Sequence, residues 1–173
     1  MLVFYICIWR YNMSNVISRW SNTMSVISKE TKELIGEHEA LIAYMRFLEK
    51  SAAKLSEQPV PAKEKVWNYC CNLYDFKDAI WKHLEVDEKV FKAILGDNYS
   101  ENNADEHHEI RNLIEQMISL ADNSVVSGLE QEQLNDYCSK LGSAFDKICK
   151  LVELHIAKEN AILERVQDTL NNR

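Results

Sequence analysis

Apolar residues recur at alternating steps of three and four along four segments of the chain, and this pattern constrains the fold more than any other feature. We expect helices over about Ser28–Gln58, Ala62–Leu95, Asn103–Val126 and Ser127–Leu170. The 173 residues include only four glycines and two prolines, whereas average proteins contain about 7% and about 5%, so a turn-rich β fold is not expected. The sequence therefore predicts an all-α protein, an antiparallel up-down-up-down four-helix bundle.

Helix-breaking residues and capping patterns mark the expected boundaries. Pro59 and Pro61 end the first helix and precede the second, which ends at Gly96 before Asp97 and Asn98. Ser127 followed three residues later by Glu130 is a capping box that we expect to open the fourth helix.

Residues 1–27 show no clear helical period, so the expected domain organisation is an N-terminal extension over 1–27 and a bundle over 28–173. The extension either lies upstream of the native start, outside the native core, or forms an additional segment on the bundle. Its first nine residues are apolar, but the stretch is too short to span a bilayer and lacks a basic leader and a cleavage site. We expect neither a signal peptide nor a membrane anchor.

The charge and the cysteines indicate the compartment and exclude some partners. The net charge of −7 repels nucleic-acid phosphates and anionic lipids, so neither nucleic acid nor membrane is an expected partner. The five cysteines are odd in number and contain no C-x-x-C pattern, which favours free thiols in a reducing cytoplasm. The sequence leaves the oligomeric state open.

Polar residues occupy positions where the bundle core should be. Four of the five histidines fall on the apolar stripes, and two carboxylates lie on the same stripes, each four residues after a histidine. An ionised carboxylate that is removed from water costs several kcal/mol unless a cation compensates it. The candidate metal ligands are His38, His83, Asp87, His107, His155 and Glu159.

Helical spacing brings these ligands together in pairs. Residues four apart are neighbours on a helix face, so His83 can chelate a metal with Asp87, and His155 with Glu159. Four imidazoles and two carboxylates would form two sites of two histidines each, bridged by both carboxylates. This donor set matches the preference of non-haem iron for nitrogen and oxygen with open positions, whereas zinc favours a closed tetrahedral set.

The ordered motifs that contain these residues resemble the hemerythrin-like, or HHE cation-binding, domain family over about residues 28–168. The motifs are GEHEAL around His38, HLEVDEKVF from His83, EHHEIR around His107 and HIAKEN from His155. The resemblance implies a four-helix bundle that holds two non-haem iron ions, oxo- or hydroxo-bridged, and binds O2 or a related small molecule, or reports or stores iron. Some members of the family respond to nitric oxide or peroxide.

Two positions depart from the oxygen-carrying members of the family. Arg111 stands where those proteins have a second histidine, four residues after the one that matches His107. The spacing between His155 and Glu159 is similar to that of the bacterial domains and the eukaryotic iron-sensing version. One iron would lose a nitrogen ligand, and water, Glu106 or a substrate would take the open position. An enzyme that turns over peroxide or nitric oxide is therefore the alternative function, and no catalytic residue is assigned.

Two further alternatives remain open from the sequence. His108 falls off the stripe and is expected to face solvent, but a register slip of one residue would exchange it with His107. A metal-free interaction bundle would need none of the six residues as ligands.

Overall fold

The computed structural model describes the backbone of residues 2–58, 61–95 and 98–171. The side chains that it describes are those of 26–58, 61–95, 104–122, 125–169 and 171. All of the regular elements in these ranges are helices: α1 (Leu2–Ser56), α2 (Lys63–Leu95), α3 (Asn98–Leu120), α4 (Asn123–Gly128), the 3₁₀ helix η1 (Gln131–Gln133) and α5 (Leu134–Asn171). The predicted all-α class is therefore confirmed.

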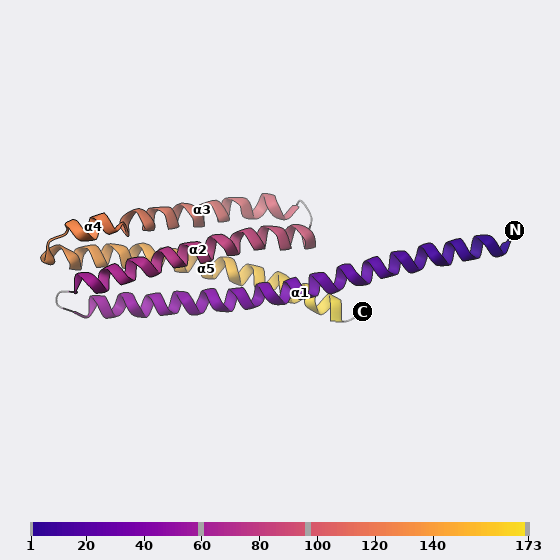
Figure 1. Cartoon of the computed structure of the whole chain (residues 1–173), viewed down its shortest axis with the longest axis horizontal. Coiled ribbons are helices and arrows are strands. Elements are labelled where there is room, and N and C mark those ends of the chain that lie inside the picture. The colour runs from indigo at the N-terminus through magenta and orange to yellow at the C-terminus, as the bar shows by residue number, and fades with distance from the viewer. Residues whose placement is uncertain (1, 59–60, 96–97, 172–173) are drawn as a thin grey trace.

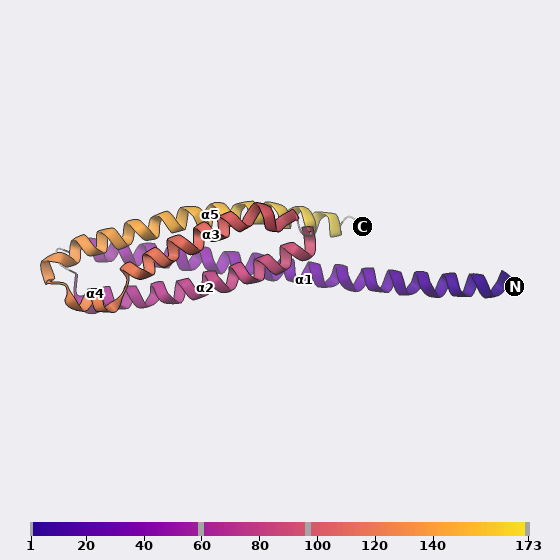
Figure 2. The same cartoon turned by 90° about the horizontal axis from the view of Figure 1, so that it is seen from above.

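The four long helices lie side by side, except for the N-terminal part of α1 (Figures 1 and 2). Helix α1 packs against α2 and α5, and α3 packs against the same two helices from the other side. The short α4 and η1 lie in the connection between α3 and α5, where α4 contacts α2 and η1 contacts α5.

Helix α1 begins far earlier than the sequence analysis predicts. The expected start was near Ser28, whereas the helix extends from Leu2 and its N-terminal part projects beyond the other helices (Figure 1). Residues 2–35 contain neither glycine nor proline, so nothing in the sequence stops the helix there. The prediction that residues 1–27 lie outside the core concerns mainly residues 1–25, whose side chains are not among those that the structure describes.

The predicted boundary between the third and fourth helices is wrong. The chain leaves α3 after Leu120 and passes through α4 and η1 before α5 begins at Leu134, so Ser127 does not open the long helix. Instead, the backbone N–H of Glu130 donates to Oε1 of Gln133 at 2.8 Å, one half of a capping box displaced by three residues. The polar run from Asp122 to Ser124 explains the break, since such side chains favour turns over helix interiors.

The core consists of two apolar clusters of unequal size. The larger fills most of the space among the four long helices, and Phe76 stacks edge to face on Phe145 within it, with ring centroids 5.4 Å apart. The smaller cluster contains Leu34, Val90, Phe91 and Leu163. Along α1, α2 and α5, the buried ionisable residues lie between members of the two clusters, so a polar layer is enclosed by apolar side chains on both sides.

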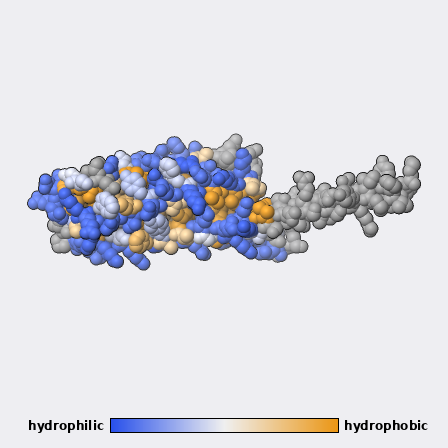
Figure 3. All heavy atoms as spheres, in the orientation of Figure 1, coloured by the Kyte–Doolittle hydropathy of each residue, from blue (hydrophilic) through white to orange (hydrophobic). Residues whose placement is uncertain are grey.

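The face of the molecule in Figure 3 is mostly hydrophilic, with smaller apolar patches. Among the residues that the structure describes, none of the helices combines the length and the apolar character needed to cross a bilayer.

Replacing Phe145 by alanine should lower the free energy of unfolding by about 3–5 kcal/mol, because the change leaves a cavity in the larger cluster. Phe145 is 2% exposed, whereas Phe47 is 51% exposed and is the matched control. Phe47→Ala should change stability by less than about 0.5 kcal/mol. Urea denaturation followed by circular dichroism measures both values, and equal losses would contradict the assignment of the core.

Candidate metal centre

The polar layer contains six ionisable side chains that come from all four long helices. None of them is more than 2% exposed. His38 comes from α1, His83 and Asp87 from α2, His107 from α3, and His155 and Glu159 from α5. The structure thus brings together all six residues that the sequence analysis selects.

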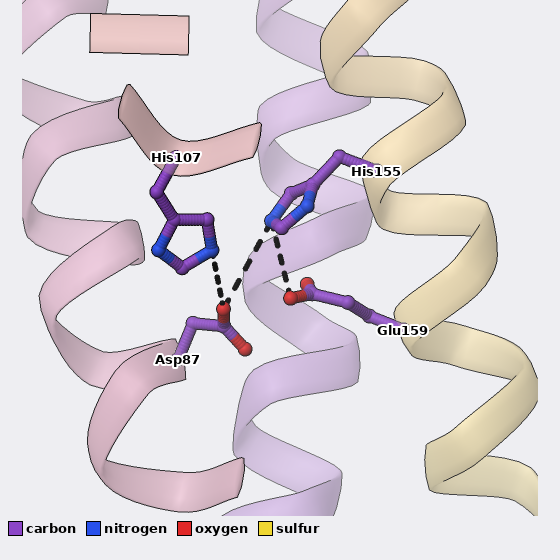
Figure 4. A group of neighbouring side chains, drawn as sticks. All are labelled: Asp87, His107, His155 and Glu159. Carbon is purple, nitrogen blue, oxygen red and sulfur yellow. Dashed lines mark ion pairs between the residues drawn. The ribbon is translucent and has the colours of Figure 1, made fainter. Parts of the chain in front are cut away.

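Potential ligand atoms in this layer form two groups, each with its atoms within 4.8 Å of one another. One group contains Asp87, His107, His155 and Glu159, which point toward one another from three helices (Figure 4). The other group consists of His38, His83 and Glu159. Glu159 belongs to both groups, whereas Asp87 belongs to one, so the two carboxylates are not equivalent.

Short contacts connect the imidazoles to Glu159. Nε2 of His155 lies 3.1 Å from Oε1 of Glu159, and Nε2 of His38 lies 3.1 Å from Oε2 of the same carboxylate. Nε2 of His83 is more distant, 3.8 Å from Oε2. Glu159 is therefore placed to join two cations, one through each oxygen.

The other carboxylate, that of Asp87, contacts the two histidines of the first group, His107 and His155. Nε2 of His107 is 3.1 Å from Oδ2 of Asp87, and Nε2 of His155 is 3.9 Å from the same oxygen. All of these contacts are made by the Nε2 atoms, which therefore face the centre of the layer.

The opposite nitrogens of two histidines donate to acidic side chains outside the layer. Nδ1 of His107 donates to Oε1 of Glu88 at 3.0 Å, and Nδ1 of His155 donates to Oε2 of Glu106 at 3.3 Å. Each of these carboxylates also accepts a hydrogen bond from a basic side chain. Nη2 of Arg111 donates to Oε1 of Glu88 at 3.0 Å, and Nζ of Lys158 donates to Oε1 of Glu106 at 2.7 Å. In the neutral form of each imidazole, its hydrogen bond to the carboxylate places the proton on Nδ1 and leaves the Nε2 lone pair directed inward.

The Nδ1 atoms of the other two histidines have no acidic acceptor within hydrogen-bond distance among the described residues. Nδ1 of His38 donates to Oδ1 of Asn160 at 2.7 Å, which is a neutral amide. Nδ1 of His83 is 3.8 Å from Oε2 of Glu37, too far for a hydrogen bond, and has no hydrogen-bond partner among the described residues.

The protonation equilibria of the layer depend on burial and on these neighbours. Burial and the adjacent His38 lower the pKa of His83 to about 4, so this imidazole is neutral at pH 7. Burial also acts to lower the pKa of His107 and of His155, but neighbouring carboxylates outweigh it and raise both values. Burial would raise the pKa of Glu159, yet His155, His38 and Asp87 hold it far below the usual range.

The layer fits a bound cation by its chemistry. The Nε2 atoms of all four histidines are buried and face carboxylate oxygens, and none of them forms a well-aligned hydrogen bond among the described residues. A bound ligand would use their lone pairs. No lysine or arginine is among the buried side chains that the structure describes, and the ionisable neighbours of the two carboxylates within the layer are imidazoles. A divalent metal accepts all of these lone pairs and compensates the charge.

Several neighbours of the layer have roles that the sequence analysis did not identify. Glu106, considered as a replacement ligand, is the acceptor for His155, and Arg111 contacts Glu88. His108 is exposed, so His107 is the inward-facing residue of the pair. Glu88 and Asn160 were missed, although each directly follows a selected carboxylate in the sequence, which is the signal that could have found them.

Comparison of the chain with protein-family models, with curated proteins and with solved structures gave no match.

His83→Gln isolates the effect of burying a neutral histidine. In the metal-free wild type, unfolded His83 gains a proton near pH 6.5, whereas the folded protein resists protonation until about pH 4. Protons therefore stabilise the unfolded state across this interval, and wild-type stability should fall relative to the variant by on the order of 3 kcal/mol. Urea denaturation at a series of pH values measures the difference, and a difference that does not change between pH 6.5 and pH 4 would contradict the assignment.

Proposed function

We propose that this chain is a hemerythrin-like, non-haem di-iron protein with an up-down-up-down four-helix bundle, and that it binds or senses dioxygen or a related small molecule, or buffers iron. The observation that carries the proposal is the pair of buried donor groups that share Glu159. The order of the motifs along the chain, described above as resembling the HHE family, supports the same conclusion.

The donor chemistry favours iron over zinc. Both groups consist of imidazole nitrogens and carboxylate oxygens. Three of the cysteines, Cys70, Cys138 and Cys149, are buried in the larger apolar cluster, and no cysteine belongs to either group among the described residues. Nitrogen and carboxylate donors with open positions are typical of non-haem iron, whereas structural zinc sites usually close a tetrahedron with thiolates.

The protein's own residues would hold and insulate such a centre. His107, His155 and Asp87 would hold one iron, His38 and His83 the other, and Glu159 both. When bound, the iron pair supplies electrons that allow reaction with dioxygen or a similar molecule. The apolar clusters on either side exclude bulk water, and the acceptors on Nδ1 fix the orientation of the imidazoles.

His107→Ala tests the proposal against a matched neighbour, His108→Ala. The first variant should lose iron because it removes a buried donor, whereas the second changes an exposed side chain and should retain about two irons per chain. Elemental analysis and the absorption spectrum before and after exposure to air measure the centre. A metal-free bundle predicts that both variants contain as little iron as the wild type.

Removal of iron should also destabilise the fold. A cation that binds only the folded state contributes about 2.7 kcal/mol when its free concentration is 100 times its dissociation constant. Treatment of the wild type with a chelator should lower the melting temperature, and the same treatment should have little effect on Asp87→Ala. Equal shifts in the two proteins would contradict the role of Asp87 as a ligand.

A second candidate function is a di-iron oxidoreductase that acts on peroxide or nitric oxide. Arg111 favours it, because this side chain contacts Glu88 and supplies no donor to the group around His107. An iron with fewer protein ligands has more open positions for turnover. Consumption of peroxide or nitric oxide far above the amount of iron, with an electron donor present, supports this reading. Reversible spectral changes in dioxygen without turnover exclude it.

A further inference from the structure

The two donor groups differ in the number of protein donors. Asp87, His107, His155 and Glu159 offer two nitrogens and two carboxylates at one position. His38 and His83 offer two nitrogens at the other position, and there the only carboxylate in the group is the shared Glu159. A cation at the first position therefore has more protein ligands and more negative charge around it.

The hydrogen bonds made by the Nδ1 atoms also favour the first position over the second. His107 and His155 each donate to a carboxylate that a surface cation holds in place. His38 donates to the neutral Asn160, and Nδ1 of His83 has no hydrogen-bond partner among the described residues. A carboxylate acceptor makes an imidazole a stronger and better oriented ligand, and losing such an acceptor typically lowers metal affinity about 10–100-fold.

Resting on the proposed function, we propose that the two metal positions fill in order. The first divalent cation binds Asp87, His107, His155 and Glu159, and the second binds His38, His83 and Glu159 only at a higher metal concentration. Glu88 and Glu106 are positioning residues for the first position. The number of cations per chain then reports the free concentration of the divalent metal, which suits a sensor or a buffer of ferrous iron.

Anaerobic titration of the metal-free full chain with Fe²⁺, and separately with Co²⁺ as a spectroscopic probe, tests the order. Calorimetry should resolve two steps of about one equivalent each, with dissociation constants that differ by at least about 10-fold. His38→Ala should remove the second step and leave the first. Asn160→Ala, a milder change outside the donor set, should weaken the second step only.

The positioning residues are tested on the first step. Glu88→Gln and Glu106→Gln should each weaken it by about 10–100-fold, because the amide is a weaker acceptor than the carboxylate. Glu109→Gln changes an exposed acid on the same helix as Glu106 and should leave both steps unchanged. Circular dichroism before each titration establishes that every variant is folded.

The outcomes separate this inference from the proposed function. One step of two equivalents, or loss of the first step in His38→Ala or Asn160→Ala, overturns the order of filling but leaves a two-metal centre intact. Unchanged first-step affinity in both glutamine variants overturns the role of Glu88 and Glu106. Absence of metal binding by the wild type overturns the proposed function itself.

Discussion

The burial of two carboxylates in the centre of a helical bundle is the constraint on which the rest of the structure depends. Asp87 and Glu159 are both at most 1% exposed, and the described core contains no lysine or arginine to neutralise them. Charged groups removed from water in this way require compensation. Four imidazoles converge on the same layer, one from each of α1, α2, α3 and α5, and two apolar clusters exclude solvent from both sides.

The sequence predicts the layer because the layer obeys helical periodicity. His38, His83, His107 and His155 lie on stripes whose other members are apolar, and a stripe position is buried wherever helices pack face to face. The same reasoning selects Asp87 and Glu159. All six are brought together by the fold, although the sequence alone does not place them at one level.

The neighbours of the layer are not predictable by the same rule. Glu88 is 50% exposed as a side chain, so a pattern that looks for burial passes over it. Whether such a residue reaches an imidazole depends on the rotation of one helix against the next, which periodicity does not specify. The early start of α1 and the break after Leu120 were missed for another reason. The period of apolar residues locates a helix but not its ends, because the ends depend on which residues favour turns.

The unequal size of the two apolar clusters has a kinetic consequence. Among the described side chains, four buried residues, Leu34, Val90, Phe91 and Leu163, form the smaller cluster, and local opening of a protein costs least where few apolar side chains are buried. On the proposed function, ions would pass in and out of the layer through transient fraying at that end of the molecule. On the proposed function, the residence time of an ion would then depend on these four side chains, none of which belongs to either donor group, and would vary independently of how tightly the donors hold the ion.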